Sequence, residues 1–221
     1  SGAPLALIDA PKLTVWRTAA ASALAARYLA REGASRLLIV GAGALAPYLI
    51  RAHSSVRPIR DITVWNRSRG SAERVADELA VQGIAVSVAD DLETAVRNAD
   101  IISTATISPE PLIHGAWLEP GQHLDCVGAF RPDMRETDDD CIRRANVWVD
   151  TMVGGKHEAG DIVIPLNSGV MSESDIQGDL FALPAGDAPR RGTDNEITMF
   201  KSVGASIEDL AAAIAIYERT N

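Results

Sequence analysis

A glycine-rich turn at residues 41–46 has the spacing that most directly indicates chemistry. Its residues, which follow the apolar run 37–40, are Gly41, Ala42, Gly43, Ala44, Leu45 and Ala46. Gly41 permits a tight turn, Gly43 lets the backbone approach a pyrophosphate, and Ala46 keeps the small third position that helix–strand packing requires. The pyrophosphate would contact the amides at the start of the next helix. The turn therefore predicts a dinucleotide site; the alternative is an ordinary connection between a strand and a helix.

The residues after the second expected strand predict which dinucleotide is bound. Enzymes that use NAD usually end this strand with Asp or Glu, which binds the ribose 2′-hydroxyl. This chain has Asn66, Arg67 and Ser68 there instead. Arg67 can pair with a 2′-phosphate, Ser68 can donate a hydrogen bond to it, and Asn66 can still reach the ribose. The pattern favours NADP(H) over NAD(H). The alternatives are that Arg67 is a solvated surface arginine and that Ser68 only caps the next helix.

These residues need a sheet to position them, and the chain predicts one. Short β-branched runs alternate with helical segments, which is typical of βαβ units. The expected strands are residues 37–40, 62–65, 85–88, 101–104, 123–127, 147–149 and 197–200. The expected helices are residues 14–30 with Thr14 as cap, 44–54, 71–82, 91–98, 173–183 and 207–217, while glycines break the stretch 153–170. The fold class is therefore α/β, a doubly wound parallel sheet of the Rossmann type.

Composition narrows the classes of partner. The net charge of −9 disfavours nucleic acid and acidic membranes, because phosphate groups need a basic surface. No apolar run is long enough to span a membrane and no signal peptide is visible, so we expect a cytoplasmic protein. Cys126 and Cys141 are too few for a disulfide framework and are expected to be buried thiols.

Metal and nucleophile chemistry find little support in the sequence. The segment around His157 is similar to a zinc-binding helix but has no second histidine, so we expect no metal. The chain contains no G-x-S-x-G elbow, and neither cysteine has a base near it in sequence. Glu158 and Asp161 are the best remaining carboxylates for a polar role in a site.

Longer blocks of the sequence resemble a known family. In chain order they include RTAAASALAARYLA, GAGALA, WNRS, TATISPEPLIHGAWLEPGQHLDCVGAFRPDMRE and ITMFKSVGASIEDLAAA. Together these blocks cover essentially the whole chain. They resemble the ornithine cyclodeaminase/μ-crystallin family, and most closely its NAD(P)H-dependent reductases of Δ1-pyrroline-2-carboxylate and related cyclic ketimines.

The resemblance implies roles for individual residues. Arg17 would hold the substrate carboxylate, and Thr18 would lie beside it at the substrate and cofactor site. From the residues alone, Arg17 would be interpreted as a surface arginine. The further residues implied to contact the cofactor are Thr104, Ala105 and Thr106 at the adenosine and ribose, Val127, Gly128 and Ala129 near the nicotinamide, and Ser202, Val203 and Gly204 closing over that ring.

One departure from the family bears on the reaction. Ornithine cyclodeaminases carry an acidic residue two positions after the glycine of the VGxD-type turn, and Phe130 occupies that position here. Phenylalanine cannot move a proton, which argues against cyclodeaminase chemistry. Asp133 and Glu136 lie nearby but at other positions of the motif. Residues 138–140 are interpreted as a solvated helix start.

The family pattern also predicts a division into domains. Residues 1–18 would be the remnant of a substrate and dimerisation domain, residues 19–204 the Rossmann domain, and residues 205–221 a helix returning to the first domain. Ser1–Gly2 resembles the turn of a hairpin, and the chain is expected to be the downstream part of a longer protein. The family's preceding segment supplies a lysine to the substrate pocket. A homodimer is expected.

The expected function is reduction of a C=N bond by NADPH. The substrate would be Δ1-pyrroline-2-carboxylate or Δ1-piperideine-2-carboxylate, and the product L-proline or L-pipecolate. The ring size, the direction and the proton donor stay open. The alternatives are an ornithine cyclodeaminase, an alanine- or opine-type dehydrogenase on the same scaffold, and a non-catalytic crystallin-like NADPH-binding protein.

Overall fold

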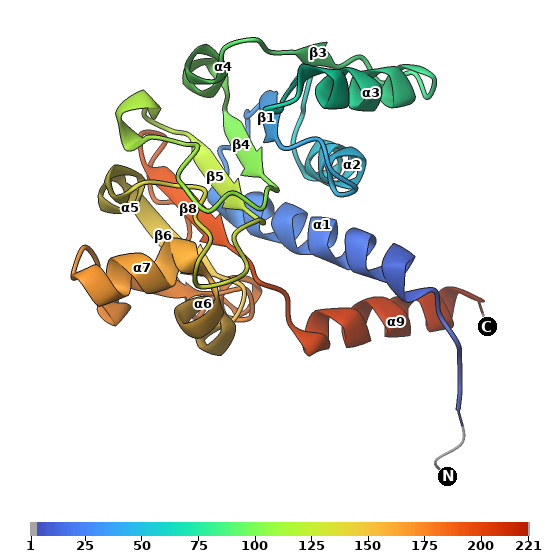
Figure 1. Ribbon diagram of the computed structural model, residues 1–221. Helices are drawn as coiled ribbons and strands as arrows, with labels where there is room; N and C mark the ends of the chain where they lie inside the picture. Colours follow the sequence, from blue (N-terminus) through green and yellow to red (C-terminus); the bar gives the residue numbers. More distant parts are fainter. Residues whose placement is uncertain (1–3, 221) are drawn as a thin grey trace.

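The computed structural model describes residues 4–220 and is built on an eight-stranded sheet whose neighbouring strands are all parallel (Figure 1). The strands are β1 (Arg36–Val40), β2 (Asp61–Trp65), β3 (Ser87–Val88), β4 (Ile101–Thr104), β5 (His123–Cys126), β6 (Ala145–Val149), β7 (Ile176–Asp179) and β8 (Ile197–Lys201). Their order is β3-β2-β1-β4-β5-β8-β6-β7. The order reverses at β1, as in dinucleotide-binding sheets, so the predicted doubly wound Rossmann fold is confirmed.

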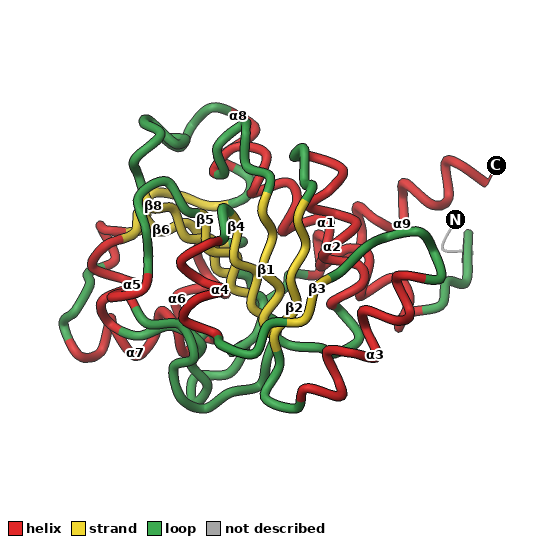
Figure 2. The backbone as a smooth tube through the Cα atoms, turned by 90° about the horizontal axis from the view of Figure 1, so that it is seen from above, coloured by secondary structure: helices red, strands yellow, loops and turns green. Residues whose placement is uncertain are grey.

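Helices cover both faces of the sheet (Figure 2). The helices are α1 (Ala10–Leu29), α2 (Ala46–Val56), α3 (Arg69–Ala80), α4 (Leu92–Asn98), α5 (Asp139–Arg144), α6 (Met152–Glu158), α7 (Gly160–Ser168), α8 (Ala182–Ala185) and α9 (Ser206–Thr220), with single 3₁₀ turns at Gly115–Trp117 and Glu173–Asp175. One face packs against α1, α2 and α3, and the other against α4, α5 and α7. None of these described helices is long and apolar enough to cross a membrane.

Helix α1 packs closely on the sheet because its inner face is made of small residues. Ala21 and Ala25 are buried against Trp148 and Phe200, the large side chains of β6 and β8. The helix begins at Ala10, earlier than the predicted Thr14, because the Asp9 side chain accepts a hydrogen bond from the Lys12 amide at 3.2 Å. It runs through residues 18 and 19 without a break.

The structure corrects several predicted elements after residue 150. The helix predicted at 173–183 is wrong: a 3₁₀ turn closed by Ser172 and Asp175 leads into β7, and only α8 is helical there. The glycine-broken stretch instead forms α6 and α7, because Thr151 caps α6 through the Gly154 amide. The predicted strand at 85–88 shortens to β3. The predicted turn at Ser1–Gly2 lies outside the described residues, and residues 4–9 form no helix or strand.

Candidate cofactor and substrate site

The two glycines of the turn after β1 differ in their surroundings: Gly41 is closely packed against the protein, whereas Gly43 borders free space. Gly41 has φ +112°, and a Cβ there would lie 2.7 Å from the carbonyl oxygen of Ala105. Its amide donates to the Trp65 carbonyl at 2.9 Å. A Cβ at Gly43, by contrast, would meet nothing within 4 Å. The fold therefore requires glycine at position 41, whereas the free space at Gly43 lets a ligand approach the backbone.

The turn offers unpartnered amides to that space. Within residues 4–220, the amides of Gly43, Ala44 and Leu45 donate to no protein acceptor. Helix α2 begins at Ala46 rather than at the predicted residue 44, and Leu45 has no side-chain oxygen to cap it. Unsatisfied amides at a helix start carry partial positive charge and bind anions. The turn thus fits a pyrophosphate.

The end of β2 is tied to this turn by Asn66. Its Oδ1 accepts from the Ala42 amide at 3.2 Å, and its Nδ2 donates to the Ser68 carbonyl at 3.0 Å. Arg67 and Ser68 are exposed, and their side chains make no hydrogen bond or ion pair within residues 4–220. Ser68 occupies the capping position of α3, but its side chain does not cap. Both side chains are therefore available to a ligand.

A cleft brings three of the predicted segments together. It is lined by the glycine turn, by the residues after β2 and by the loop after β4, including Gly41, Ala42, Gly43, Asn66, Arg67, Ser68, Ala105, Thr106 and Ile107. All three segments follow the carboxyl ends of strands, which is where open α/β sheets bind ligands.

Two of the predicted ribose-loop residues instead bind a buried carboxylate. The Thr104 hydroxyl donates to Glu136 Oε2 at 2.7 Å, and the Thr106 hydroxyl and amide donate to Oε1, each at 2.7 Å. Glu136 is completely buried. Burial raises the pKa of Glu136 to about 7, although the nearby Lys201 opposes the shift. The sequence placed Glu136 near the site, yet nothing in its spacing indicated these contacts.

Glu136 belongs to a polar cluster that also contains Asp161 and Lys201. Asp161 Oδ1 accepts from the amides of Glu136 and Thr137, at 3.0 and 2.9 Å, while Oδ2 lies 3.6 Å from Lys201 Nζ. Lys201 Nζ also donates to the Gly128 carbonyl. Asp161 was predicted from the sequence as a candidate carboxylate, whereas Lys201 was not. The available signal was a lysine at the end of a mainly apolar strand.

The turn after β5 is held tightly in this cluster. The amides of Val127 and Gly128 donate to the Thr104 carbonyl at 2.8 and 3.1 Å. A Cβ at Gly128 would lie 2.2 Å from the Thr106 carbonyl oxygen, so only glycine fits. Ala129 follows with φ +48°, an unfavourable value for a residue with a Cβ. Phe130 comes next and is 48% exposed.

The segment at residues 202–204 is fixed by Asp150, which the sequence analysis missed. Asp150 Oδ2 accepts from the amides of Val203 and Gly204 at 2.7 and 2.6 Å. A Cβ at Gly204 would lie 2.5 Å from Arg17 NH1, so the predicted substrate clamp packs on this segment. Asp150 directly follows a buried strand, a position at which polar residues commonly serve a site.

Arg17 is paired within the chain. Its NH1 donates to Glu208 at 3.0 Å, and its Nε donates to Asp209 at 2.9 Å, both from α9. Thr18, the next residue of α1, is buried. The predicted substrate arginine therefore lies beside the segment expected to close over the nicotinamide, but carboxylates of α9 occupy part of its guanidinium.

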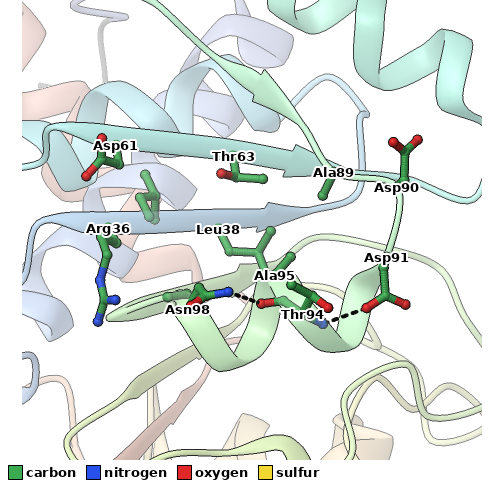
Figure 3. Close-up of a pocket in the computed structure, with 12 residues that line it drawn as sticks. Arg36, Leu38, Asp61, Thr63, Ala89, Asp90, Asp91, Thr94, Ala95 and Asn98 are labelled. Atoms are coloured by element: carbon green, nitrogen blue, oxygen red, sulfur yellow. Dashed lines mark hydrogen bonds between the residues drawn. The ribbon is translucent and has the colours of Figure 1, made fainter.

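A separate hollow lies beneath α4, away from the residues described above (Figure 3). It extends from Arg36 and Asp61, which begin β1 and β2, to residues 89–91, which follow β3. Several of its polar groups are engaged: Asp91 accepts from the Thr94 amide at 2.8 Å, and Arg36 pairs with Asp100. We assign no site to it.

Among the described residues, potential metal ligands and cysteines form no second reactive site. Within residues 4–220, no group of three His, Cys, Asp or Glu side chains is arranged to hold a metal ion. Cys126 and Cys141 are both free and buried, as predicted. Burial raises the pKa of both thiols, which keeps them protonated and unreactive.

Comparison with known proteins identifies the family. The sequence profile of the ornithine cyclodeaminase/mu-crystallin family matches residues 1–221. The Delta(1)-pyrroline-2-carboxylate reductase of Colwellia psychrerythraea is 38% identical over 221 residues, which cover 99% of this chain and 70% of that protein.

Solved structures agree with this sequence match. The Thermococcus litoralis Delta(1)-pyrroline-2-carboxylate reductase in complex with NADH and L-proline has TM-score 0.95 and 37% identity, covering 99% of this chain and 68% of that one. An archaeal alanine dehydrogenase dimer with bound NAD has TM-score 0.92 and 33% identity, covering 99% and 67%. The chain belongs to the ornithine cyclodeaminase/mu-crystallin family and has the fold of its nicotinamide-dinucleotide-binding oxidoreductases.

Proposed function

We propose that the protein reduces the C=N bond of a cyclic imino acid, with NADPH preferred over NADH. The substrate would be Δ1-pyrroline-2-carboxylate or Δ1-piperideine-2-carboxylate, giving L-proline or L-pipecolate. The observation that carries the proposal is the row of unpartnered amides at residues 43–45, in a cleft at the carboxyl edge of the sheet. The similar Thermococcus litoralis reductase, in complex with NADH and L-proline, supports the substrate class.

The cofactor would be held by the three segments of the cleft. The amides of Gly43, Ala44 and Leu45 would bind the pyrophosphate. Arg67 and Ser68, whose side chains have no partners in residues 4–220, would bind the 2′-phosphate of NADPH. Asn66 would contact the ribose from the position in which the Ala42 amide holds it.

The substrate would be oriented by Arg17. Its NH2 nitrogen makes no hydrogen bond within residues 4–220, so one side of the guanidinium can still bind a carboxylate. The chemistry that a bound reduced nicotinamide would supply is hydride donation to the carbon of the protonated imine. The protein's task is then to hold the carboxylate, exclude water and align the reactants. Phe130, at the position where cyclodeaminases carry an acid, would give the site an apolar side chain.

We also propose that residues 1–18 and 205–221 contribute to a separate substrate and dimerisation domain around the Rossmann domain at residues 19–204. Large apolar side chains on these segments support the proposal. Leu5 and Leu7 are 78% and 102% exposed, and Leu210 and Ile214 on α9 are 54% and 47% exposed. Such side chains are usually covered in an assembly, here a homodimer.

The proposed function is tested by following NADPH and NADH oxidation with the five- and six-membered cyclic imino acids. Ornithine, and pyruvate with ammonia, serve as competing substrates in the same assay. We expect turnover with the imino acids and a lower KM for NADPH. Tight NADPH binding without turnover of any imine would contradict the proposed reductase activity and favour a crystallin-like binding protein.

An alanine-type dehydrogenase is the second candidate. The archaeal alanine dehydrogenase is 33% identical and has TM-score 0.92. Reduction of pyruvate with ammonia, in the absence of activity on either cyclic imine, would favour this candidate.

A further inference from the structure

Lys201 lies where the two halves of the proposed nicotinamide site meet. It is the last residue of β8, paired in register with Cys126 of β5 and Val149 of β6. The next residues along the chain are the 202–204 segment, and the turn at 127–129 follows β5 directly. One side chain therefore stands between the two backbone segments proposed to contact the ring.

The Lys201 side chain is unusually placed for a lysine. It is completely buried, and Nζ donates to the carbonyl of Gly128 while lying 3.6 Å from Asp161 Oδ2. Asp161 Oδ2 has no hydrogen-bond partner within residues 4–220, although Oδ1 accepts from backbone amides. A buried lysine charge is costly unless it is compensated, so Asp161 and Glu136 make this placement tolerable.

The group that Lys201 binds is a backbone carbonyl at a strained turn. Gly128 is enclosed by Thr106 and Glu136, and Ala129 has φ +48°. A left-handed residue other than glycine persists only where its surroundings hold it. No other group among the described residues donates to the Gly128 carbonyl, so without Lys201 this carbonyl would be unpaired there and the peptide between Gly128 and Ala129 free to relax.

We propose that Lys201 is a positioning residue for hydride transfer. By holding the Gly128 carbonyl, it fixes the turn at 127–129 against the 202–204 segment, which Asp150 holds from the other side. The two segments then form a single rigid cradle for the nicotinamide ring and the imine. The inference rests on the proposed function, because it assigns these segments to the reacting end of the cofactor.

The test removes the ammonium while keeping its volume. Lys201→Met leaves two carboxylates without their cation, so the double variant Lys201→Met/Glu136→Gln restores the charge balance and guards against loss of folding. It is compared with Glu136→Gln alone, because Glu136 also binds Thr104 and Thr106. Lys156→Met is the matched control, since Lys156 lies on α6 and, within residues 4–220, pairs only with the exposed Glu173.

The readout separates the two ends of the cofactor. ADP binding reports on the glycine turn, whereas kcat and the isotope effect with 4-deuterated NADPH report on alignment of the ring. We expect the double variant to bind ADP within about twofold of Glu136→Gln, while kcat falls roughly 10- to 100-fold below that of Glu136→Gln. The isotope effect should increase, because hydride transfer becomes slower than the other steps.

Two results would overturn the inference: an unchanged kcat and isotope effect, or a parallel loss of ADP binding that indicates general damage. Failure of the proposed function is distinguishable, because the wild-type protein would then turn over none of the imines. In that case the fluorescence of bound NADH decides the inference. It should differ between the double variant and Lys156→Met, and an identical signal would overturn it.

Discussion

The guanidinium of Arg17 donates to the Glu208 carboxylate at 3.0 Å, joining α1 to α9 across 191 residues of sequence. Burial, together with the charge of Asp150, raises the pKa of Glu208, while Arg17 acts in the opposite direction. The positive charge of Arg17, which is proposed to bind the substrate carboxylate, is thus already partly compensated by Glu208. A substrate carboxylate would share Arg17 with α9 rather than meet a free cation.

Replacing Arg17 with methionine should weaken substrate binding more than it slows the chemical step. Loss of a charged hydrogen bond costs about 1.5–3 kcal/mol, which corresponds to an increase in KM of roughly 10- to 100-fold. Steady-state kinetics on the cyclic imines measure this. Arg27→Met, at an exposed position on the same helix, is the control. Equal KM values for the two variants would remove Arg17 from the substrate site.

Replacing each glycine of the turn with alanine should affect a different property, stability at Gly41 and cofactor binding at Gly43. Gly41→Ala places a Cβ 2.7 Å from a carbonyl oxygen at φ +112°, so it should lower the free energy of unfolding by about 1–3 kcal/mol. Gly43→Ala should leave the unfolding free energy near wild type but weaken NADPH binding, since its Cβ enters open space. Thermal unfolding and NADPH titration measure both. Normal NADPH affinity in Gly43→Ala would contradict the proposed phosphate contact.

Arg67→Asp should discriminate between the two cofactors. A carboxylate at this position repels a 2′-phosphate but can accept a hydrogen bond from a 2′-hydroxyl, so NADPH binding should fall by at least about tenfold while NADH binding changes little. Fluorescence titration with each cofactor checks this. Arg74→Asp, which changes an exposed residue of α3, should leave the affinity for both cofactors unchanged. Equal losses of both cofactors in Arg67→Asp would exclude a phosphate role.

Glu136 should make stability depend on pH. Its pKa is raised from 4.5 to about 7 in the folded state, so the folded protein binds more protons than the unfolded chain between these values. The contribution is therefore present below pH 4.5 and is lost as the pH rises to about 7. The loss is of the order of 3 kcal/mol or less.

Urea unfolding of wild type and Glu136→Gln at pH 5 and pH 7.5 measures the contribution of Glu136 to the free energy of unfolding. The difference in unfolding free energy between the two proteins should shift in favour of Glu136→Gln at the higher pH. Glu110→Gln, at an exposed position, should show no such shift. A difference that stays constant with pH would show that Glu136 is ionised throughout.

The sequence predicts those parts of the fold that depend on local patterns. Residues 37–40 of β1 form a continuous buried apolar run, and such runs are recognisable without any partner. The segment at 173–183 was misassigned because its acidic residues suggest a helix start. In the folded chain Ser172 and Asp175 bond each other in a tight turn, and β7 gains its hydrogen bonds from β6.

The residues of the candidate site also differ in how far their roles depend on local sequence. The glycine turn and Arg67 were predicted because their roles depend on neighbours in sequence. Glu136, Asp150 and Lys201 act through residues that are distant along the chain: Glu136 binds Thr104, and Asp150 binds Val203. No spacing encodes such contacts, since they exist only after the strands have assembled.

Strand β8 is the last strand along the chain, yet it lies between β5 and β6. During synthesis, β6 and β7 leave the ribosome before the strand that connects them to the rest of the sheet. Until Ile197–Lys201 emerge, β5 and β6 each present an open edge that can recruit a foreign strand. A chain that ends between residues 180 and 196 would therefore hold β1 to β5 and the pair β6–β7 as two sheets that no strand joins.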